Sequence, residues 1–256
     1  MSTVVKALEV LDLFSETRPT VSLSEAARLL SRDKSTAQRH LNDLCAAGLL
    51  EREPGGRGYY LGHSLTRYAM IRERTHPKAE ALHRIVTRLV AESGETAHAS
   101  LYANGALKTV EIVDTTFKGT RVYIDPADDL PLHATASGVA FLSTAPPDVV
   151  ESVIGGKLVC FTGATPVDPV QLTSQVMETR LKGYAVARGT FEEDVVGQAA
   201  PVLGYAGEAI GAVAIAVPSA RFNDEVQGRN ARLLRDAAQD ISRLYGGPAY
   251  SEPRSA

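Results

Sequence analysis

Residues 21–61 constrain the fold of this chain more than any other stretch. Ser22 and Glu25 form a capping-box pair that opens a short helix, because each side chain can satisfy a free backbone amide of its first turn. After a short turn, a second helical pattern runs to Gly48, where left-handed backbone is expected to end it. A Gly-rich hairpin occupies residues 49–61. Two helices followed by a hairpin predict a winged helix-turn-helix.

The flanking sequence predicts one helix before this stretch and one after it. The first begins almost at the N-terminus and is broken by Arg18 and Pro19; its apolar stripe is Val4, Ala7, Leu8, Leu11 and Phe14. Residues 64–75 contain three arginines and a narrow apolar side, and Pro77 follows. They predict a linker helix that is a solvated connector, faces phosphate or a partner subunit, or does both.

The rest of the chain alternates between strand-like and helix-like patterns. An amphipathic helix over Leu82 to Val90 precedes a predicted hairpin, residues 96–114, whose Asn104-Gly105 pair is the favoured two-residue turn. Further strands are predicted at 121–125, 184–188, 199–203 and 209–217, and helices at 137–143, 171–181 and 223–245. These patterns predict an α+β domain of a sensory type, an antiparallel sheet flanked by helices.

Composition limits the classes of protein to which the chain can belong. The chain has 256 residues, 44% of them hydrophobic, 22% charged, with a net charge of -3, which is ordinary for a globular protein. Two distant cysteines and the lack of a signal peptide or a long apolar run predict a cytoplasmic protein without a membrane partner. We expect a winged helix-turn-helix domain at 1–62, a linker helix at 63–76, an effector domain at 77–247 and a tail at 248–256.

The second helix of the motif carries the candidate DNA contacts. One face is apolar and should pack inward; the other is polar. Ser22 at the start of the first helix and Arg57 at the tip of the hairpin complete the set. The candidate DNA-binding residues are Ser22, Lys34, Ser35, Thr36, Gln38, Arg39, Asn42 and Arg57. Arginine and glutamine can bind guanine and adenine edges through two hydrogen bonds. Gln38 also fits a capping-box pair with Ser35, so it either caps the helix or reads a base.

The charge of the N-terminal residues does not by itself identify a DNA-binding domain, and the chain contains no obvious catalytic site. Residues 1–62 contain eight basic and eight acidic residues, so a basic surface requires a suitable arrangement, and some winged helices bind proteins instead. The rest of the chain offers no clear catalytic set: His133, Thr135 and Ser137 lie close in sequence without an obvious base or orienting group. No metal-ligand spacing or nucleotide loop occurs, so no metal and no cofactor are expected.

Several short motifs occur in a consistent order along the chain. They are Lys34-Ser35-Thr36 with Arg39, Tyr60-Leu61-Gly62, the LPLHATASG segment at 130–138, Gly183-Tyr184, Ala199-Ala200-Pro201-Val202, and Phe222. From Val4 to Gly246 the chain therefore resembles the IclR family of bacterial transcription regulators. The resemblance implies a winged helix joined by a helix to a GAF-like effector domain. It also implies homodimers or dimers of dimers on palindromic operators, which repress or activate genes and often respond to small organic or aromatic acids.

The resemblance also implies the position of an effector pocket. Its matching positions are Val122, Leu130, Thr135, Ala136, Ser137, Gly138, Ala187, Gly197, Ala214 and Ala216, with Arg188 as a further anchor. Backbone amides at 135–138 suit a carboxylate. Sensors of small acids tend to have an acidic residue at position 187 and serines at 214 and 216. Alanines there enlarge the site and make it more apolar, so we predict a bulkier or aromatic ligand rather than glyoxylate.

The function expected from the sequence is a ligand-responsive, DNA-binding transcriptional regulator that is not an enzyme. Three alternatives stay open. The chain could be a small-molecule enzyme with a vestigial winged helix, a protein-interaction scaffold, or a regulator that has lost ligand sensing. The effector, the operator and the sign of regulation are not encoded in any motif.

Overall fold

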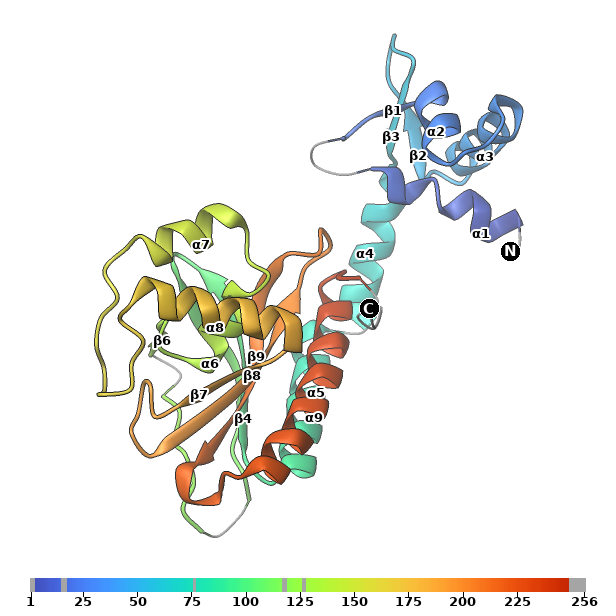
Figure 1. Ribbon diagram of the computed structural model, residues 1–256. Helices are drawn as coiled ribbons and strands as arrows, with labels where there is room; N and C mark the ends of the chain where they lie inside the picture. The colour runs from blue at the N-terminus through green and yellow to red at the C-terminus, as the bar shows by residue number, and fades with distance from the viewer. Residues whose placement is uncertain (1–2, 15–17, 76, 117–118, 126–127, 249–256) are drawn as a thin grey trace. The chain divides into compact units, whose positions relative to one another are not determined.

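The computed structural model describes residues 3–14, 18–75, 77–116, 119–125 and 128–248 (Figure 1). The chain divides into two compact units, Met1–Pro77 and Lys78–Ala256. Each unit has its own hydrophobic core.

The first unit is a winged helix-turn-helix, as the sequence predicts. Its elements are α1 (Thr3–Leu8), the 3-10 turn η1 (Leu11–Leu13), β1 (Val21–Ser22), α2 (Leu23–Leu29), α3 (Lys34–Ala46), β2 (Leu50–Arg52), β3 (Gly58–Leu61) and α4 (His63–Thr75). The strands form an antiparallel sheet in the order β1-β3-β2. Gly48, at φ +68°, follows α3 in the left-handed conformation expected there.

The prediction of one continuous helix before residue 18 is wrong over the described residues. α1 ends at Leu8, and the chain turns into η1. Val10 and Leu13 are buried in the core beneath α2 and α3, whereas Val4 and Leu8 stay exposed. The turn after Leu8 thus brings into the core a pair of side chains that lies off the predicted apolar stripe.

The second unit is an α+β fold on one antiparallel sheet. Its strands are β4 (Thr96–Ala103), β5 (Ala106–Val113), β6 (Asp129–Leu130), β7 (Ala185–Arg188), β8 (Val195–Leu203) and β9 (Ala209–Pro218), in the order β6-β5-β4-β9-β8-β7. Its helices are α5 (Lys78–Ser93), α6 (Ala136–Leu142), α7 (Pro147–Ile154), α8 (Pro169–Lys182) and α9 (Asp224–Leu244), with a 3-10 turn, η2 (Ser219–Arg221). Asn104 and Gly105 both have positive φ, so the predicted tight turn is confirmed.

Helices cover both faces of the six-stranded sheet. α5 and α9 lie side by side on one face, where Leu82, Val86, Leu234 and Ile241 pack against β4, β8 and β9 (Figure 1). α6 and α8 belong to the core of the opposite face, around the fully buried Phe141. The α6 face holds the pocket described below.

Three features of the second unit differ from the sequence prediction. Residues 121–125 are not a strand, since they form no ladder with a neighbour. The two-residue strand β6 pairs with β5 instead, with Leu130 opposite Leu107. The helix α7 was not predicted; Pro146 is its N-cap and Pro147 its first residue, and a proline at the first helical position needs no amide partner.

Candidate functional site

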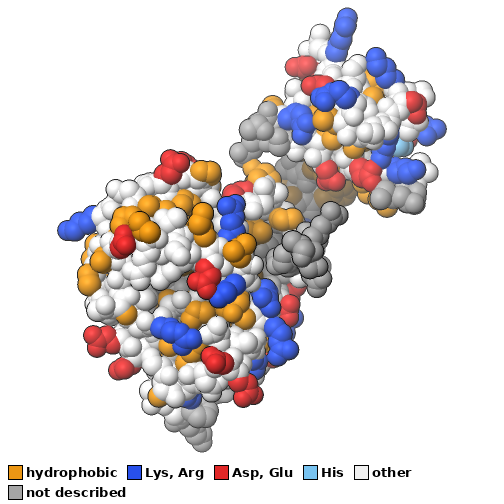
Figure 2. Space-filling model, viewed as in Figure 1, with side chains coloured by type: hydrophobic (Ala, Val, Ile, Leu, Met, Phe, Trp, Pro, Cys, Tyr) orange, Lys and Arg blue, Asp and Glu red, His pale blue; other side chains and the backbone are white. Residues whose placement is uncertain are grey.

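The exposed face of α3 and the hairpin tip carry basic side chains without protein partners. Lys34, Arg39 and Arg57 are exposed, and within the described residues none of them has a recorded hydrogen bond or ion pair. Lys and Arg side chains, interspersed with acidic ones, lie over the visible face of this unit (Figure 2). Unpaired guanidinium and ammonium groups are the side chains that neutralise phosphates.

The start of α3 is capped differently from the prediction. Asp33 is the N-cap: its carboxylate accepts hydrogen bonds from the Thr36 amide at 2.8 Å and from the Ser35 hydroxyl. These bonds hold the pKa of Asp33 well below its usual range. The Ser35–Gln38 capping pair that the sequence left open does not form, because Asp33 is the N-cap and Ser35 is the second residue inside α3. At α2 the predicted capping box of Ser22 and Glu25 is confirmed, which commits the Ser22 hydroxyl to Glu25.

Gln38 instead joins a polar network between α3 and the hairpin. Its amide nitrogen donates to Asn42 Oδ1 and to the Tyr59 hydroxyl, each at 3.0 Å. Arg52 donates to the same Asn42 oxygen at 2.8 Å, and its guanidinium lies over the Tyr59 ring. The amides of Gln38 and Asn42 therefore fix α3 against the hairpin. Arg52 and Tyr59 belong to the same network, and the sequence analysis did not select them.

Glu51 on β2 connects the hairpin to the start of α4. Its carboxylate accepts from the His63 backbone amide at 2.9 Å and from the Tyr60 hydroxyl at 2.8 Å, and His63 Nδ1 lies 2.8 Å away. The hydrogen bonds from His63 and Tyr60 lower the pKa of Glu51 to about 2. Glu51 thus satisfies an orphan amide at the N-terminus of α4.

The second unit contains a pocket on the α6 face of the sheet. Two rows of small side chains cross β7, β8 and β9 beneath it: Ala187, Gly197 and Ala216, and then Ala185, Ala199 and Ala214. His98 continues the second row on β4. A Cβ atom at Gly197 would lie 3.1 Å from the Ala136 methyl, so α6 begins close above this row. The pocket holds about 660 Å³ free of protein atoms, part of it open to solvent.

Nine of the eleven predicted effector positions line this single pocket. They are Val122, Leu130, Thr135, Ala136, Ser137, Ala187, Gly197, Ala214 and Ala216. Most of these side chains are small or apolar, and they come from loops, α6 and four different strands. The pocket therefore has the composition typical of a small-molecule site, an apolar lining with a few polar groups.

Two predicted anchors do not lie in the pocket. The Arg188 guanidinium donates to Gln227 at 2.7 Å and lies over the Phe222 ring, so α9 and the segment before it hold it away from the lining. The Gly138 amide donates to Thr135 Oγ1 at 3.0 Å as part of the α6 cap, which leaves it unavailable to a carboxylate. The prediction that Arg188 and the Gly138 amide anchor a ligand is therefore wrong.

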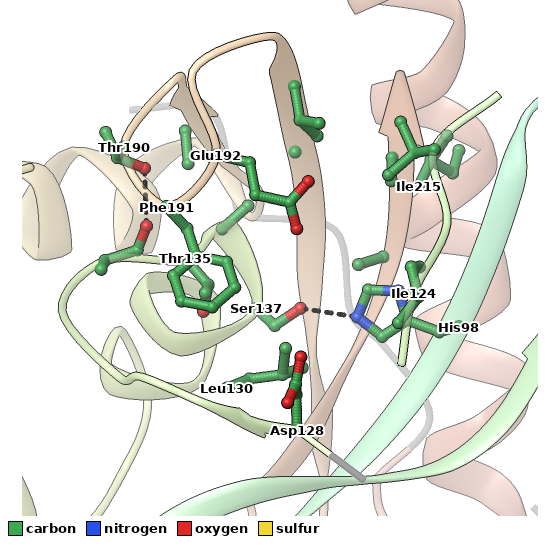
Figure 3. A pocket seen from close by; sticks show the side chains of 18 of the residues that line it. His98, Ile124, Asp128, Leu130, Thr135, Ser137, Thr190, Phe191, Glu192 and Ile215 are labelled. Atoms are coloured by element: carbon green, nitrogen blue, oxygen red, sulfur yellow. Dashed lines mark hydrogen bonds between the residues drawn. The ribbon is translucent and has the colours of Figure 1, made fainter. Parts of the chain in front are cut away.

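His98 is the main pocket residue that the sequence analysis missed. Its Nε2 lies 3.2 Å from Ser137 Oγ, and both side chains are buried at the back of the pocket (Figure 3). Nδ1 has no hydrogen-bond partner in the described residues, so no carboxylate orients the ring as a catalytic base would require. Burial lowers the pKa of His98 to about 4, which keeps it neutral near pH 7.

This buried histidine makes the stability of the second unit depend on pH. In the unfolded chain the imidazole takes up a proton near pH 6.5, whereas in the folded protein it does so only near pH 4. The stability that His98 confers is complete above pH 6.5 and falls as the pH drops toward 4. Between pH 7 and 5 we expect a loss of about 2 kcal/mol. Urea unfolding of His98→Gln and the parent chain should show this difference; identical pH dependence would contradict it.

The mouth of the pocket is formed by segments outside the predicted site. Ile124, Asp125 and Asp128 come from the stretch before β6, and Phe191 and Glu192 from the loop between β7 and β8. Thr190 donates to the Ala134 carbonyl at 2.6 Å and holds this loop beside the start of α6. In the described residues, no group of three possible metal ligands is found, nor any helix both long and apolar enough to cross a bilayer.

Both units of the chain match domains of one known protein family. The C-terminal domain of the bacterial transcriptional regulator IclR matches residues 74–243, and the IclR helix-turn-helix domain matches residues 3–54. The chain belongs to the IclR family. The IclR helix-turn-helix match covers α2 and α3, and the IclR C-terminal match covers every residue that lines the pocket.

Individual IclR relatives are similar over nearly the whole chain. The regulator BhcR of Paracoccus denitrificans is 28% identical over 93% of this chain and 85% of its own length. A crystal structure of an IclR-type regulator from Silicibacter sp. TM1040 is 32% identical, covers all of both chains and superposes with a TM-score of 0.76. An IclR homologue from Microbacterium hydrocarbonoxydans, solved with 4-hydroxybenzoate, is 23% identical, with a TM-score of 0.59 over 95% of this chain and 99% of its own.

Proposed function

We propose that the chain is a transcriptional regulator whose binding to operator DNA is modulated by a small organic ligand. DNA binding is assigned to residues 1–62 and ligand binding to residues 77–247, with residues 63–76 connecting them. The observation that carries the proposal is the coexistence of unpaired basic side chains on a winged helix and a built pocket in a separate unit. It would act as a homodimer or a dimer of dimers on a palindromic site, as the family resemblance implies, because each winged helix reads one half-site.

The proposed DNA contacts fall into two groups, side chains without a partner in the described residues and side chains already bonded within the protein. Lys34 and Arg57 would bind phosphates, since each is exposed and unpaired, and Arg39 would reach a base edge from the middle of the exposed α3 face. Gln38 and Asn42 would position α3 rather than read sequence, because their amides are bonded to each other and to the hairpin. Ser22, Ser35 and Thr36 would contribute through the caps that orient the helix starts.

The lining of the pocket supports a fairly apolar or aromatic ligand. Val122, Leu130 and Phe191 provide apolar walls, and alanines at 214 and 216 leave room where longer or polar side chains would intrude. An aromatic compound occupies the homologue from M. hydrocarbonoxydans. A ligand of this kind would bury its ring against the sheet, whereas a very small polar acid would leave its oxygen atoms without partners.

The proposal is tested by titrating the full chain into fluorescent DNA from upstream of its own gene. Fluorescence anisotropy should show binding that prefers this DNA over a scrambled duplex and weakens between about 50 and 200 mM salt, as phosphate contacts require. Binding that ignores both sequence and salt would overturn the assignment. The titration needs no effector, so it tests DNA binding apart from ligand binding.

The alanines of the pocket floor provide a prediction about ligand size. Ala214→Ser combined with Ala216→Ser places two hydroxyls on the floor, so the ratio of glyoxylate to benzoate affinity should rise about tenfold. Both probes are monoanions, so charge cancels in the ratio, which isothermal titration calorimetry measures. Ala212→Ser is the matched control, because it lies on the same face of β9 outside the pocket lining. An unchanged ratio in the double variant would count against these positions as the floor.

A further inference from the structure

The charge of the pocket is one-sided. Asp125, Asp128 and Glu192 line it, and no lysine or arginine is found among its described lining residues. Figure 3 shows the carboxylates of Asp128 and Glu192 pointing from opposite sides toward the space in front of Ser137 and His98. The mouth of the pocket is therefore a site of negative potential above an apolar floor.

The nearest cations are engaged elsewhere. Arg188 donates to Gln227, and Arg221 forms a two-bond ion pair with Glu95. Arg121 lies on the adjoining surface, which it shares with Asp125, Asp128, Glu192 and Asp194, and its guanidinium is 3.8 Å from the Asp114 carboxylate. None of these guanidinium groups lines the pocket, so no arginine or lysine among its described lining residues offsets the charges of Asp128 and Glu192.

The pKa of Glu192 is raised by this environment. Partial burial raises its pKa, and the nearby negative charge of Asp128 raises it further. Both effects mean that the ionised carboxylate is less stable here than in water, and a positive charge placed between the two groups would relieve that cost. A ligand carboxylate in the same space would add a third negative charge.

The buried back of the pocket supplies an independent indication. His98 is 94% buried, it projects into the pocket, and its Nδ1 has no partner in the described residues (Figure 3). A buried polar atom without a partner is uncommon unless a ligand or water completes it. The neutral tautomer that donates from Nε2 to Ser137 leaves Nδ1 as an acceptor, which needs an N–H or O–H donor from a water or a ligand.

We propose that this pocket selects an organic cation, an amine carried on an aromatic or apolar body, over a carboxylate of the same shape. The ammonium would lie between Asp128 and Glu192, near the Phe191 ring, and the body would rest on the alanine floor. This inference rests on the proposed function, because it names the ligand class of the same pocket. It departs from the acid expected from the amides at 135–138, of which the Thr135 amide is bonded to the Pro131 carbonyl and the Gly138 amide to Thr135 Oγ1.

Three probes of the same body and different charge test the proposal. They are 2-phenylethylamine, 2-phenylethanol and phenylacetate, titrated into the full chain by isothermal titration calorimetry. The amine should bind at least about tenfold more tightly than phenylacetate at low salt, with the alcohol between them. Asp128→Asn combined with Glu192→Gln should remove this preference, while Glu193→Gln, an exposed neighbour outside the lining, should leave it unchanged.

Three results would contradict the proposed preference for a cation. Phenylacetate binding as tightly as the amine, or a preference that survives the double variant, would overturn the inference. So would the absence of binding by any probe up to about 10 mM. The anisotropy titration with operator DNA contains no ligand, so a chain that binds DNA but rejects the amine loses only this inference and keeps the proposed DNA-binding function.

Discussion

Replacing Arg39 with alanine should weaken binding to the specific DNA by about 10- to 100-fold, corresponding to about 1–3 kcal/mol for a base contact. The side chain is exposed on α3, and no partner within the described residues would have to be released. It is also far from the first unit's core, so the variant should fold normally. Competition anisotropy against the parent chain, with matched and scrambled duplexes, measures the loss.

Arg39→Lys separates a base contact from a phosphate contact. Lysine keeps the charge but cannot form the paired hydrogen bonds of a guanidinium. If Arg39 reads a base, Arg39→Lys should retain the salt dependence of binding and still lose most of the preference for the specific duplex. Full recovery of specific binding by lysine would instead place Arg39 on a phosphate, and an unaffected Arg39→Ala would remove it from the interface.

Gly138→Ala should destabilise the second unit by about 3 kcal/mol, because a Cβ atom there would overlap with the backbone of Leu132. Backbone cannot move aside as the end of a flexible side chain can. The loop that carries Leu132 would have to separate from α6, opening the pocket at Thr135. Thermal unfolding of the full chain should show the transition of this unit lowered by about 5–10 °C.

Gly228→Ala is the matched control for this prediction. Gly228 lies in α9, and a Cβ atom there would meet no atom within 4 Å. Alanine in an open helical position should stabilise the unit by about 1 kcal/mol, the difference in helix propensity. A Gly138→Ala variant that unfolds with the parent chain, or with Gly228→Ala, would show that the loop accommodates the methyl group.

The sequence predicts elements whose side chains repeat over several turns or strands. The stripe of Leu82, Val86 and Leu89 identifies α5, and the Asn104-Gly105 pair fixes the β4–β5 turn. Prediction failed where two local signals competed. Asp33 and Ser35 are both capping residue types, and only the structure shows that the aspartate bonds the Thr36 amide.

The pocket could be predicted only in part, for a physical reason. Its floor consists of positions on paired strands, and the motifs of the family identify them in the sequence. Its mouth depends on where two loops meet, and no periodicity links Asp128 to Glu192. The orientation of His98 is likewise set by pairing with Ala214, 116 positions along the chain, rather than by its neighbours. Two loops that are distant in sequence together supply the negative charge of the pocket mouth, so the sequence alone did not predict it.

The bonds of Glu51 have a mechanical consequence. Because its carboxylate holds the His63 amide and the Tyr60 hydroxyl, the strand β3 and the first turn of α4 are joined on both sides of Gly62. The Gly62 and Ser64 amides add bonds to Leu49 and Gly48, beside the end of α3. The junction therefore behaves as a stiff lever arm rather than a hinge. Any torque on α4 would rotate the hairpin and α3 together as one body, changing the angle at which they meet DNA.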